Sequence, residues 1–294
     1  MKKRCTAIVL AAGGGRRMNS TVAKQFMPLG GRPLLWYSLQ AVERSGIIDD
    51  CILVTGKDDI SYVRREIVEK FGFDKVDLLV EGGRERWESV ANAVAALASP
   101  GRRVPNRDGY VFIHDGARPF LNEEILGRTY ETVKAYQACV AAMPSKDTMK
   151  LANEEGLAVS TPDRGHLWSI QTPQVFDVKL IVKAYGALRE KAAREGFEAV
   201  AVTDDASVVE LFTDCPVKLT EGSYENIKIT TPEDMKVAEV FLADKRYRKF
   251  RLPDRLNNRP AIPAQTCIRL RKARGQIRER RLEPRCRSFF VKSC

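Results

Sequence analysis

The chain has 294 residues, 44% of them hydrophobic, which is enough to bury the core of one large domain or two small ones. No run approaches the roughly 18 apolar residues that a membrane-spanning helix needs. The formal net charge of +11 is uneven, because residues 245–294 carry 17 Lys and Arg against 3 Asp and Glu. The residues before Lys245 are slightly acidic, so the basic composition gives no sign that the body of the chain binds nucleic acid.

The seven cysteines are widely spaced, odd in number and without a C-x-x-C pair. They predict neither a disulfide framework nor a zinc site. Cys51 and Cys139 lie in apolar runs and are expected to be small core residues, which fits a reducing, cytoplasmic compartment. The basic N-terminus and its short apolar run are similar to a secretory signal, but the run ends in glycines and arginines, which favours a buried strand.

Short apolar runs alternate with helical patterns along residues 6–143. Strands are predicted at Thr6–Leu10, Cys51–Thr55, Val76–Val80, Tyr110–His114 and Cys139–Met143. Helices are predicted from Pro33 onward and at Asp58–Phe71, Arg86–Leu97 and Glu123–Tyr136. This alternation predicts an α/β fold, with a Rossmann-like, mostly parallel sheet and helices on both faces. Ligands in such folds bind beyond the carboxyl ends of the strands.

The alternation stops after Met143. Residues 144–172 are polar, turn-rich and weakly periodic, and they predict a β-arm that protrudes from the sheet. Further elements are predicted beyond the arm: helices at Val178–Glu195, Asp204–Phe212 and Pro232–Ala243, and short strands at Val217–Thr220 and Ile227–Ile229. The predicted domain therefore covers residues 1–244.

Residues 245–294 contain four prolines, many arginines and no stable repeat. Such a segment cannot bury enough apolar surface to offset its chain entropy, so we expect a basic, disordered tail. Two origins stay open: a frameshifted or extended C-terminus, or a genuine basic arm.

A glycine-rich turn, A-A-G-G-G-R-R-M over residues 11–18, follows the first predicted strand. Its glycines allow backbone N–H groups to approach a phosphate closely, although they also fit an ordinary strand-to-helix turn. Met18 stands where a dinucleotide fingerprint needs its third glycine, and the Gly-Lys-Ser/Thr ending of a P-loop is absent. Arg17 and Lys24 add two cations, which suits a triphosphate and charge developing at phosphorus.

This segment resembles the nucleotide signature of the sugar-phosphate nucleotidyltransferases, in the form found in cytidylyltransferases. The matching residues are Ala11, Ala12, Gly13, Gly15, Arg17, Met18, Lys24, Gln25 and Phe26. The family usually has proline before this lysine, whereas this chain has Ala23. The resemblance implies that the turn binds CTP and that Arg17 and Lys24 act in catalysis.

The third predicted strand is followed by the motif E-G-G-x-x-R-x-x-S-V, which begins at Glu81. Gly82 and Gly83 can present backbone groups to a flat base, and Ser89 can hydrogen-bond to it. A loop and helix cap would have the same pattern. In the family this stretch contributes to cytosine recognition, which implies that Gly82, Gly83, Arg86 and Ser89 bind CTP.

The fourth predicted strand runs into H-D-G-A-R-P, which begins at His114. A carboxylate at a strand end can hold Mg2+ on nucleotide phosphates, although Asp115 could also cap the next turn. The run resembles the family's H-D-x-A-R-P, which implies that Asp115 binds the metal and Arg118 the sugar phosphate. His114 is expected to be structural, because a phosphate monoester is already anionic near neutral pH.

The arm contains three short motifs, D-T-x-K, D-R and L-W-x-x-Q-T-P-Q, which carry no signal singly but together resemble family elements. The resemblance implies a homodimer in which the arms exchange. Arg164 would then reach the partner's active site, where a guanidinium suits a phosphate monoester. Thr148 and Thr172 would line the pocket for methylerythritol phosphate.

Two motifs near the end of the periodic chain also match the family, so the resemblance covers about residues 6–243. In T-D-D-A-S, Asp204 is either a helix N-cap or a substrate-binding residue. In the closing motif, Lys228 stands among apolar neighbours, which is an odd choice for a core. Its amine is expected to face the pocket and to act on the phosphate.

The resemblance implies an enzyme that transfers the cytidylyl group of CTP to 2-C-methyl-D-erythritol 4-phosphate in the non-mevalonate isoprenoid pathway. The acceptor phosphate attacks the α-phosphorus directly, so catalysis is mainly positioning and electrostatics. Two alternatives stay open: another polyol phosphate such as ribitol 5-phosphate as the acceptor, or nucleic-acid binding through the tail. A nicotinamide-dependent dehydrogenase is disfavoured by Met18.

Overall fold

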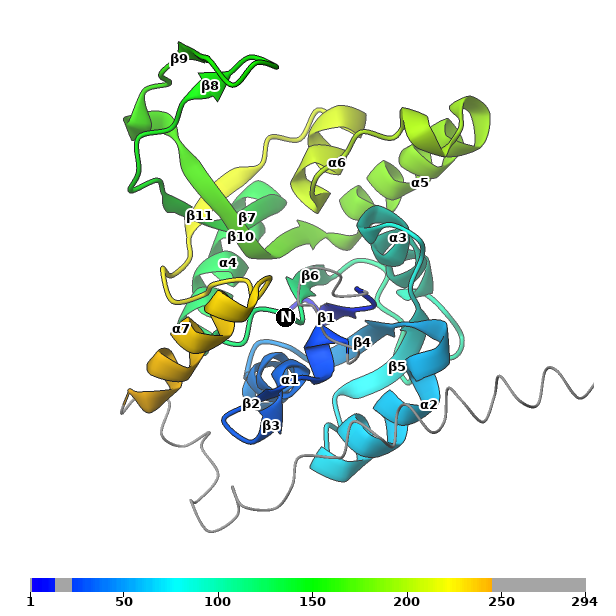
Figure 1. Cartoon of the computed structure of the whole chain (residues 1–294). Coiled ribbons are helices and arrows are strands. Elements are labelled where there is room, and N and C mark those ends of the chain that lie inside the picture. The colour runs from blue at the N-terminus through cyan, green and yellow to red at the C-terminus, as the bar shows by residue number, and fades with distance from the viewer. Residues whose placement is uncertain (1, 14–22, 245–294) are drawn as a thin grey trace, which may run out of the picture. The chain divides into compact units, whose positions relative to one another are not determined.

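The computed structural model of the chain describes residues 2–13 and 23–244. They form an α/β fold around a seven-stranded sheet with the order β11-β7-β10-β6-β1-β4-β5 (Figure 1). The predicted fold class is confirmed. Two residues with predicted roles, Gly15 and Arg17, lie outside the described residues, and so does the predicted tail at 245–294.

One half of the sheet is parallel. Each of its strands begins and ends within one residue of the predicted bounds. It consists of β1 (Cys5–Ala11), β4 (Asp50–Thr55), β5 (Val76–Glu81) and β6 (Tyr110–Asp115). β1 lies in the middle of this half and pairs with both β4 and β6. The chain order therefore reverses at β1, and the carboxyl ends of β1 and β6 lie side by side.

The other half of the sheet holds a strand that the sequence analysis missed. β10 (Trp168–Asp177) lies antiparallel between β6 and β7 (Ala138–Pro144), and β7 pairs in parallel with β11 (Lys218–Glu221). The start of β10 is exposed in the arm, and its buried part begins with polar residues. This pattern is not the apolar run or the strict alternation by which a strand is recognised.

The predicted strand at Ile227–Ile229 is wrong. The segment forms no strand, and the N–H of Ile229 donates to the carbonyl oxygen of Ala117 at 2.9 Å. The segment is a loop, and its two isoleucine side chains pack against the core, which explains the alternating pattern.

The helices cover both faces of the sheet. They are α1 (Leu34–Arg44), α2 (Ile60–Tyr62) with a π-helical continuation at Val63–Glu69, α3 (Arg86–Ala96), α4 (Glu123–Tyr136), α5 (Val178–Glu195), α6 (Asp205–Phe212) and α7 (Pro232–Ala243). Short 3-10 turns lie at Lys24–Phe26, Lys57–Asp59, Arg164–His166 and Phe197–Ala199. Within the described residues, no helix has both the length and the apolar character to cross a bilayer.

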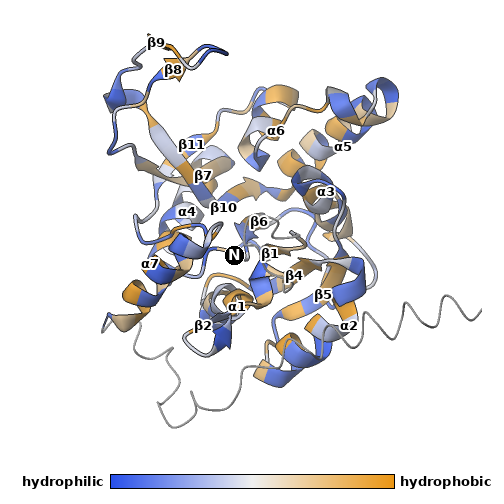
Figure 2. Cartoon of the chain, in the orientation of Figure 1, coloured by the Kyte–Doolittle hydropathy of each residue, from blue (hydrophilic) through white to orange (hydrophobic). Residues whose placement is uncertain are grey.

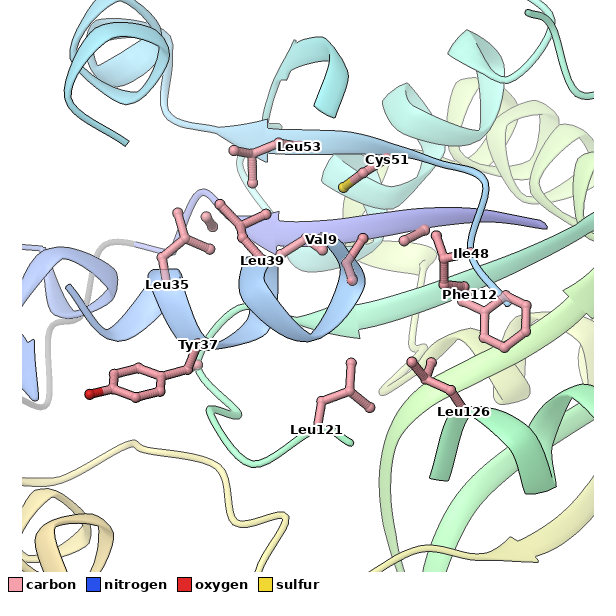
Figure 3. Close-up of a cluster of buried hydrophobic side chains, with 14 of the residues drawn as sticks. Val9, Leu35, Tyr37, Leu39, Ile48, Cys51, Leu53, Phe112, Leu121 and Leu126 are labelled. Carbon is pink, nitrogen blue, oxygen red and sulfur yellow. The ribbon is translucent and has the colours of Figure 1, made fainter. Parts of the chain in front are cut away.

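Two hydrophobic cores lie on opposite faces of the sheet because successive strand residues point to opposite sides. Along β1, Val9 points to a core shared with α1, α4 and α7, whereas Ile8 points to a core shared with α3, α5 and α6. Figure 3 shows the first core, with Leu35 and Leu39 of α1 close to the sheet. Each buried Leu or Ile stabilises the fold by about 1.5–3 kcal/mol.

Two small antiparallel pairs stand apart from the main sheet. β2 (Pro28–Leu29) and β3 (Arg32–Pro33) precede α1, whereas β8 (Leu151–Ala152) and β9 (Ala158–Ser160) form the end of the predicted arm. The arm projects from the sheet between β7 and β10 (Figure 1). Figure 2 shows hydrophobic residues along it, and Leu151, Leu157 and Val159 are each more than half exposed.

Candidate active site

Charged side chains gather beyond the carboxyl end of β6, at the edge where the strand order reverses. Asp115, the last residue of β6, is contacted there by Arg86, Arg118 and Lys228. We call these four residues the strand-end cluster. All four are predicted site residues, and the fold brings them together from α3, from the end of β6 and the turn after it, and from the loop before α7.

Asp115 is a buried carboxylate held by three cations. Its Oδ2 lies 2.8 Å from Nζ of Lys228 and 3.8 Å from Nε of Arg118, and its Oδ1 lies 3.5 Å from Nε of Arg86. Burial acts to raise the pKa of Asp115, but the charges of Arg86, Lys228 and Arg118 outweigh it and hold the pKa well below its usual value. Asp115 is therefore ionised at neutral pH.

Arg86 begins α3 and is clamped by a residue that the sequence analysis missed. Its Nη1 and Nη2 donate to the two carboxylate oxygens of Asp205 at 2.9 and 2.7 Å. Asp205 is fully buried and also accepts a hydrogen bond from the hydroxyl of Tyr185 at 2.7 Å. Burial acts to lower the pKa of Arg86, but the charge of Asp205 outweighs it and raises the pKa, so this guanidinium stays charged.

The loop after β5 lies against the end of β1. A Cβ added to Gly82 would stand 2.3 Å from Cβ of Ala12, so only glycine allows this approach. The hydroxyl of Ser89 accepts from the N–H of Gly83 at 3.0 Å and lies 3.2 Å from the carbonyl oxygen of Glu85, to which it can donate. The predicted CTP-binding residues Ala12, Gly82, Gly83 and Ser89 are therefore neighbours, and Ala11 and Gly13 flank Ala12.

Lys24 reaches the same region through the loop before α7. Its Nζ donates to the carbonyl oxygen of Ile229 at 3.2 Å, next to Lys228. The side chain of Lys228 is 37% exposed, so its amine faces Asp115 and also solvent. One connected set of contacts thus includes Lys24, Lys228 and Asp115. The sequence predicts that all three lie at one phosphate-binding edge.

Thr172 also lies at this edge, but its side chain is 3% exposed. Its hydroxyl accepts from the N–H of Asp115 at 3.1 Å and lies 3.0 Å from Nδ1 of His114. Arg118 is buried as well, and its Nη1 donates to the carbonyl oxygen of Asn226 at 2.7 Å. Burial lowers the pKa of Arg118, and the charge of Asp115 partly opposes this.

Three predicted site residues lie elsewhere within this chain. Thr148 and Arg164 are exposed on the arm, where Nη1 of Arg164 donates to the carbonyl oxygen of Lys146 at 3.4 Å. Asp204 caps α6 by accepting from the N–H of Ser207 at 2.9 Å, and it accepts from Nε2 of Gln174 at 2.9 Å. No hydrogen bond or ion pair joins these three to the strand-end cluster in the part of the chain that the structure describes.

The residues that the sequence analysis missed are Asp205, Tyr185 and Gln174. The T-D-D-A-S motif contains two adjacent aspartates, and the sequence alone does not say which caps α6 and which turns inward to Arg86. Gln174 completes this arrangement, because its Oε1 accepts from the N–H groups of both Asp205 and Ala206 at 2.9 Å. Tyr185 has the spacing of a core residue of an amphipathic helix, and no sequence signal marks its hydroxyl.

Comparisons with known proteins give one consistent result. Residues 5–244 match the family described as 2-C-methyl-D-erythritol 4-phosphate cytidylyltransferase (IspD). The chain is 48% identical over 237 residues to the protein of that name from Lachnospira eligens, covering 81% of this chain and 98% of the relative. It is 43% identical over 242 residues to the one from Lachnoclostridium phytofermentans, covering 82% and 97%.

Solved structures agree with the sequence relatives. The structure of 4-diphosphocytidyl-2C-methyl-D-erythritol synthase from Anaerococcus prevotii superposes with a TM-score of 0.68 at 36% identity, covering 82% of this chain and 97% of that one. The 2-C-methyl-D-erythritol 4-phosphate cytidylyltransferase from Thermus thermophilus gives a TM-score of 0.62 at 27% identity, covering 81% and 98%.

Proposed function

Because the chain belongs to the 2-C-methyl-D-erythritol 4-phosphate cytidylyltransferase family, we propose that the strand-end cluster and Lys24 form its active site. The enzyme transfers the cytidylyl group of CTP to 2-C-methyl-D-erythritol 4-phosphate and releases pyrophosphate, a step of the non-mevalonate isoprenoid pathway. The observation that carries the site is the excess of positive charge around Asp115, at the edge of the sheet where ligands of such folds bind.

CTP binds, in this proposal, along the ends of β1 and β5. Backbone N–H groups of the turn that contains Ala11, Ala12, Gly13 and Gly15 contact the phosphates. Gly82, Gly83 and Ser89 contact the cytosine, with Arg86 beside them. The close approach of Gly82 to Ala12 supports this assignment, because the two segments to which these roles are assigned are neighbours.

The acceptor phosphate attacks the α-phosphorus of CTP in line. A bond forms between a phosphate oxygen of the acceptor and this phosphorus, the bond to the bridging oxygen breaks, and pyrophosphate carries away the electron pair. Arg17 and Lys24 stabilise the charge on the transferring group, while Arg118 and Lys228 hold the acceptor phosphate. The reaction needs no enzyme nucleophile, so the chain contributes positioning and electrostatics.

Mg2+ fits this edge as a partner of the CTP phosphates. Asp115 offers an ionised carboxylate, and Mg2+ commonly binds through one or two carboxylates together with substrate phosphates. In the described residues, no group of three or more His, Cys, Asp or Glu could form a protein cage for a metal. We therefore propose that Asp115 holds Mg2+ only in the presence of the triphosphate. A bound Mg2+ neutralises phosphate charge.

The arm supports a homodimer in which Thr148 and Arg164 complete the partner's site. Its apolar side chains are exposed within one chain; they include Met149 at 52% and Val159 at 68%. Burying them against a second copy would remove this apolar surface from water. We also propose a cytoplasmic location, because Cys5, Cys51, Cys139 and Cys215 are free thiols, which persist in a reducing compartment.

A pyrophosphate-release assay tests the proposed reaction. Wild-type enzyme is supplied with each nucleoside triphosphate in turn, and with methylerythritol phosphate or ribitol 5-phosphate as the acceptor. We expect turnover with CTP, methylerythritol phosphate and Mg2+. A chain cut after Asp244 should keep this activity, because the proposed site lies within residues 1–244. Preference for ribitol 5-phosphate, or activity that disappears with the cut, would contradict the proposal.

A further inference from the structure

Lys228 lies on a loop, residues 222–231, which joins β11 to α7 and contains no helix or strand. A loop holds a side chain in one place only if other contacts replace the hydrogen bonds of regular secondary structure. One such contact follows Lys228, because the N–H of Ile229 donates to the carbonyl oxygen of Ala117 at 2.9 Å. The part of the loop that precedes Lys228 is held differently, by side chains.

Asn226, two residues before Lys228, is a polar residue in the interior of the protein. It is 0% exposed, and its Nδ2 donates to the carbonyl oxygen of Thr172 at 2.8 Å and to Oε1 of Gln171 at 3.2 Å. These two bonds use both protons of the amide. Its Oδ1 is buried and has no hydrogen-bond partner in the part of the chain that the structure describes. The amide therefore ties the loop to β10.

Gln171 of β10 binds the same loop at a second point. Its Oε1 accepts from the N–H of Ser223 at 3.4 Å, and its Nε2 donates to the carbonyl oxygen of Ser223 at 2.8 Å. The side-chain amide thus pairs with the backbone of Ser223 as a neighbouring strand would. A Cβ on Gly222 would stand 2.4 Å from this Oε1, so glycine allows the close approach.

The backbone of Asn226 connects the loop to a second cation of the strand-end cluster. Its carbonyl oxygen accepts from Nη1 of Arg118 at 2.7 Å. Two residues further along, Nζ of Lys228 lies 2.8 Å from Oδ2 of Asp115. A lysine side chain is long and loses much rotamer freedom when it is held in one direction. The position of the Lys228 amine therefore depends on how firmly the backbone beside it is held.

We propose that Asn226 is a positioning residue for cytidylyl transfer: its buried amide, supported by Gln171, holds the loop on β10 so that the amine of Lys228 faces Asp115 and the acceptor phosphate. Asn226 then acts through Lys228 and makes no contact with the acceptor. The inference rests on the proposed function and adds to it the residue that holds one of its cations in place.

The kinetic test compares Asn226→Ala with Asn106→Ala, which removes another buried amide. Asn106 is 1% exposed and binds the carbonyl oxygens of Arg4 and Tyr110 at the starting ends of the strands, away from the site. Misplacing a catalytic group by about 1 Å can cost ~100-fold in rate. We expect Asn226→Ala to lower kcat/KM for methylerythritol phosphate by ~10- to 100-fold with KM for CTP nearly unchanged, and folded Asn106→Ala to keep both values. Kinetic constants in Asn226→Ala equal to those of Asn106→Ala would overturn the proposal.

A double-mutant cycle with Lys228→Met separates positioning from direct contact. If Asn226 acts through Lys228, Asn226→Ala should reduce kcat/KM by less than ~3-fold once the amine is absent. If Oδ1 of Asn226 contacted the acceptor, the loss would be the same with and without Lys228, and the proposal would be wrong. Gln171→Met removes the partner amide and provides the same cycle if Asn226→Ala does not fold.

Crystal structures of the wild type and Asn226→Ala, both without substrate, give a readout that does not depend on turnover. We expect the contact between Nζ of Lys228 and Oδ2 of Asp115 to be lengthened or lost in the variant, and the contact between Arg86 and Asp115 to remain. An unchanged position of Lys228 would overturn the proposal. Absence of turnover in the wild type would instead refute the proposed function.

Discussion

One group of charged residues lies at the starting ends of the strands and another at their carboxyl ends, and the two groups differ in charge balance. At the starting ends of the strands, Arg4 and Arg102 pair with Asp50, and Nε of Arg102 lies 3.2 Å from Asp77. We call these four residues the strand-start cluster. Two cations face two anions there, and the side chains of Arg102 and Asp77 are fully buried.

The strand-end cluster also contains two arginines, but it has a lysine in place of one aspartate. Three cations contact Asp115, and one of them, Arg86, also pairs with Asp205, so three cations face two anions. The side chains of Arg86 and Lys228 are 28% and 37% exposed. A set of charges in which cations and anions balance has no charge left for a ligand, so its effect is on folding. An excess of partly exposed cations at the other edge leaves positive charge for an anionic substrate. Charge balance therefore separates the structural cluster from the one proposed to be functional.

The largest expected effect comes from breaking the strand-start cluster. Arg102→Met would leave Asp50 with Arg4 alone and Asp77 without its buried partner. Removing one member of a buried ion pair typically costs about 3–5 kcal/mol, and we expect a loss of that size in the free energy of unfolding. Urea denaturation followed by circular dichroism measures it. The remaining folded enzyme should turn over normally, so a stable variant with reduced kcat would reverse the roles of the two clusters.

The corresponding change in the strand-end cluster is Lys228→Met. Because Lys228 is partly exposed and Asp115 keeps Arg86 and Arg118, stability should change by less than about 1 kcal/mol. Turnover should fall by ~100- to 1,000-fold, because a cation that stabilises phosphate charge is lost. Lys236→Met, an exposed position on α7, is the matched control for the change of charge. Equal losses of activity in both variants would show a general charge effect.

The arm allows the comparison to be extended to a second subunit. If Arg164 acts on the partner's site, Arg164→Ala and Lys24→Ala impair different sites of a mixed dimer. One site then carries both changes and the other carries neither. Random pairing of equal amounts should restore about a quarter of wild-type activity, because half of the dimers are mixed and each has one intact site. Each variant alone should be nearly inactive, and mixing without recovery would place Arg164 in its own subunit's site.

The sequence predicts the fold well where burial follows a simple period. β1 and β4 are apolar on both faces, and α4, α5 and α7 begin and end where their patterns do. The sequence does not predict β10, because polar residues of this strand are buried and make hydrogen bonds at the site. Thr172 binds His114 and Asp115, and Gln174 binds the start of α6. A strand that places polar groups inside the protein does not have the pattern of a core strand.

The site likewise contains some residues that the sequence predicts and others that it does not. Asp115 and Lys228 are predictable because one ends a strand and the other is a lysine among apolar neighbours. The Arg86–Asp205 pair joins residues 119 positions apart, and no local pattern specifies it. Likewise, the sequence predicts that Thr172 belongs to the site, but the contacts of its hydroxyl come only from how β10 lies beside β6.

The smallest expected effect concerns Asp234, a carboxylate held by backbone N–H groups rather than by cations. It accepts from the N–H of Thr230 and of Thr231 at 2.7 and 2.8 Å, at the start of α7. Burial acts to raise the pKa of Asp234, but these hydrogen bonds outweigh it and lower the pKa. Its contribution to stability is therefore present above the unfolded-state pKa of about 4 and is lost as the pH falls through the lower folded-state value.

Asp234→Asn removes this charge while keeping a similar shape. We expect a loss of about 0.5–1 kcal/mol in the free energy of unfolding at pH 7, as for an acidic residue at a helix N-terminus. The difference in the free energy of unfolding between wild type and variant should narrow as the pH is lowered below about 4. At low pH, Asp234 becomes protonated in both the folded and the unfolded wild-type protein. Urea denaturation at pH 7 and at lower pH measures both values. A difference in the free energy of unfolding that stays constant with pH would mean that the negative charge of Asp234 is not what stabilises the start of α7.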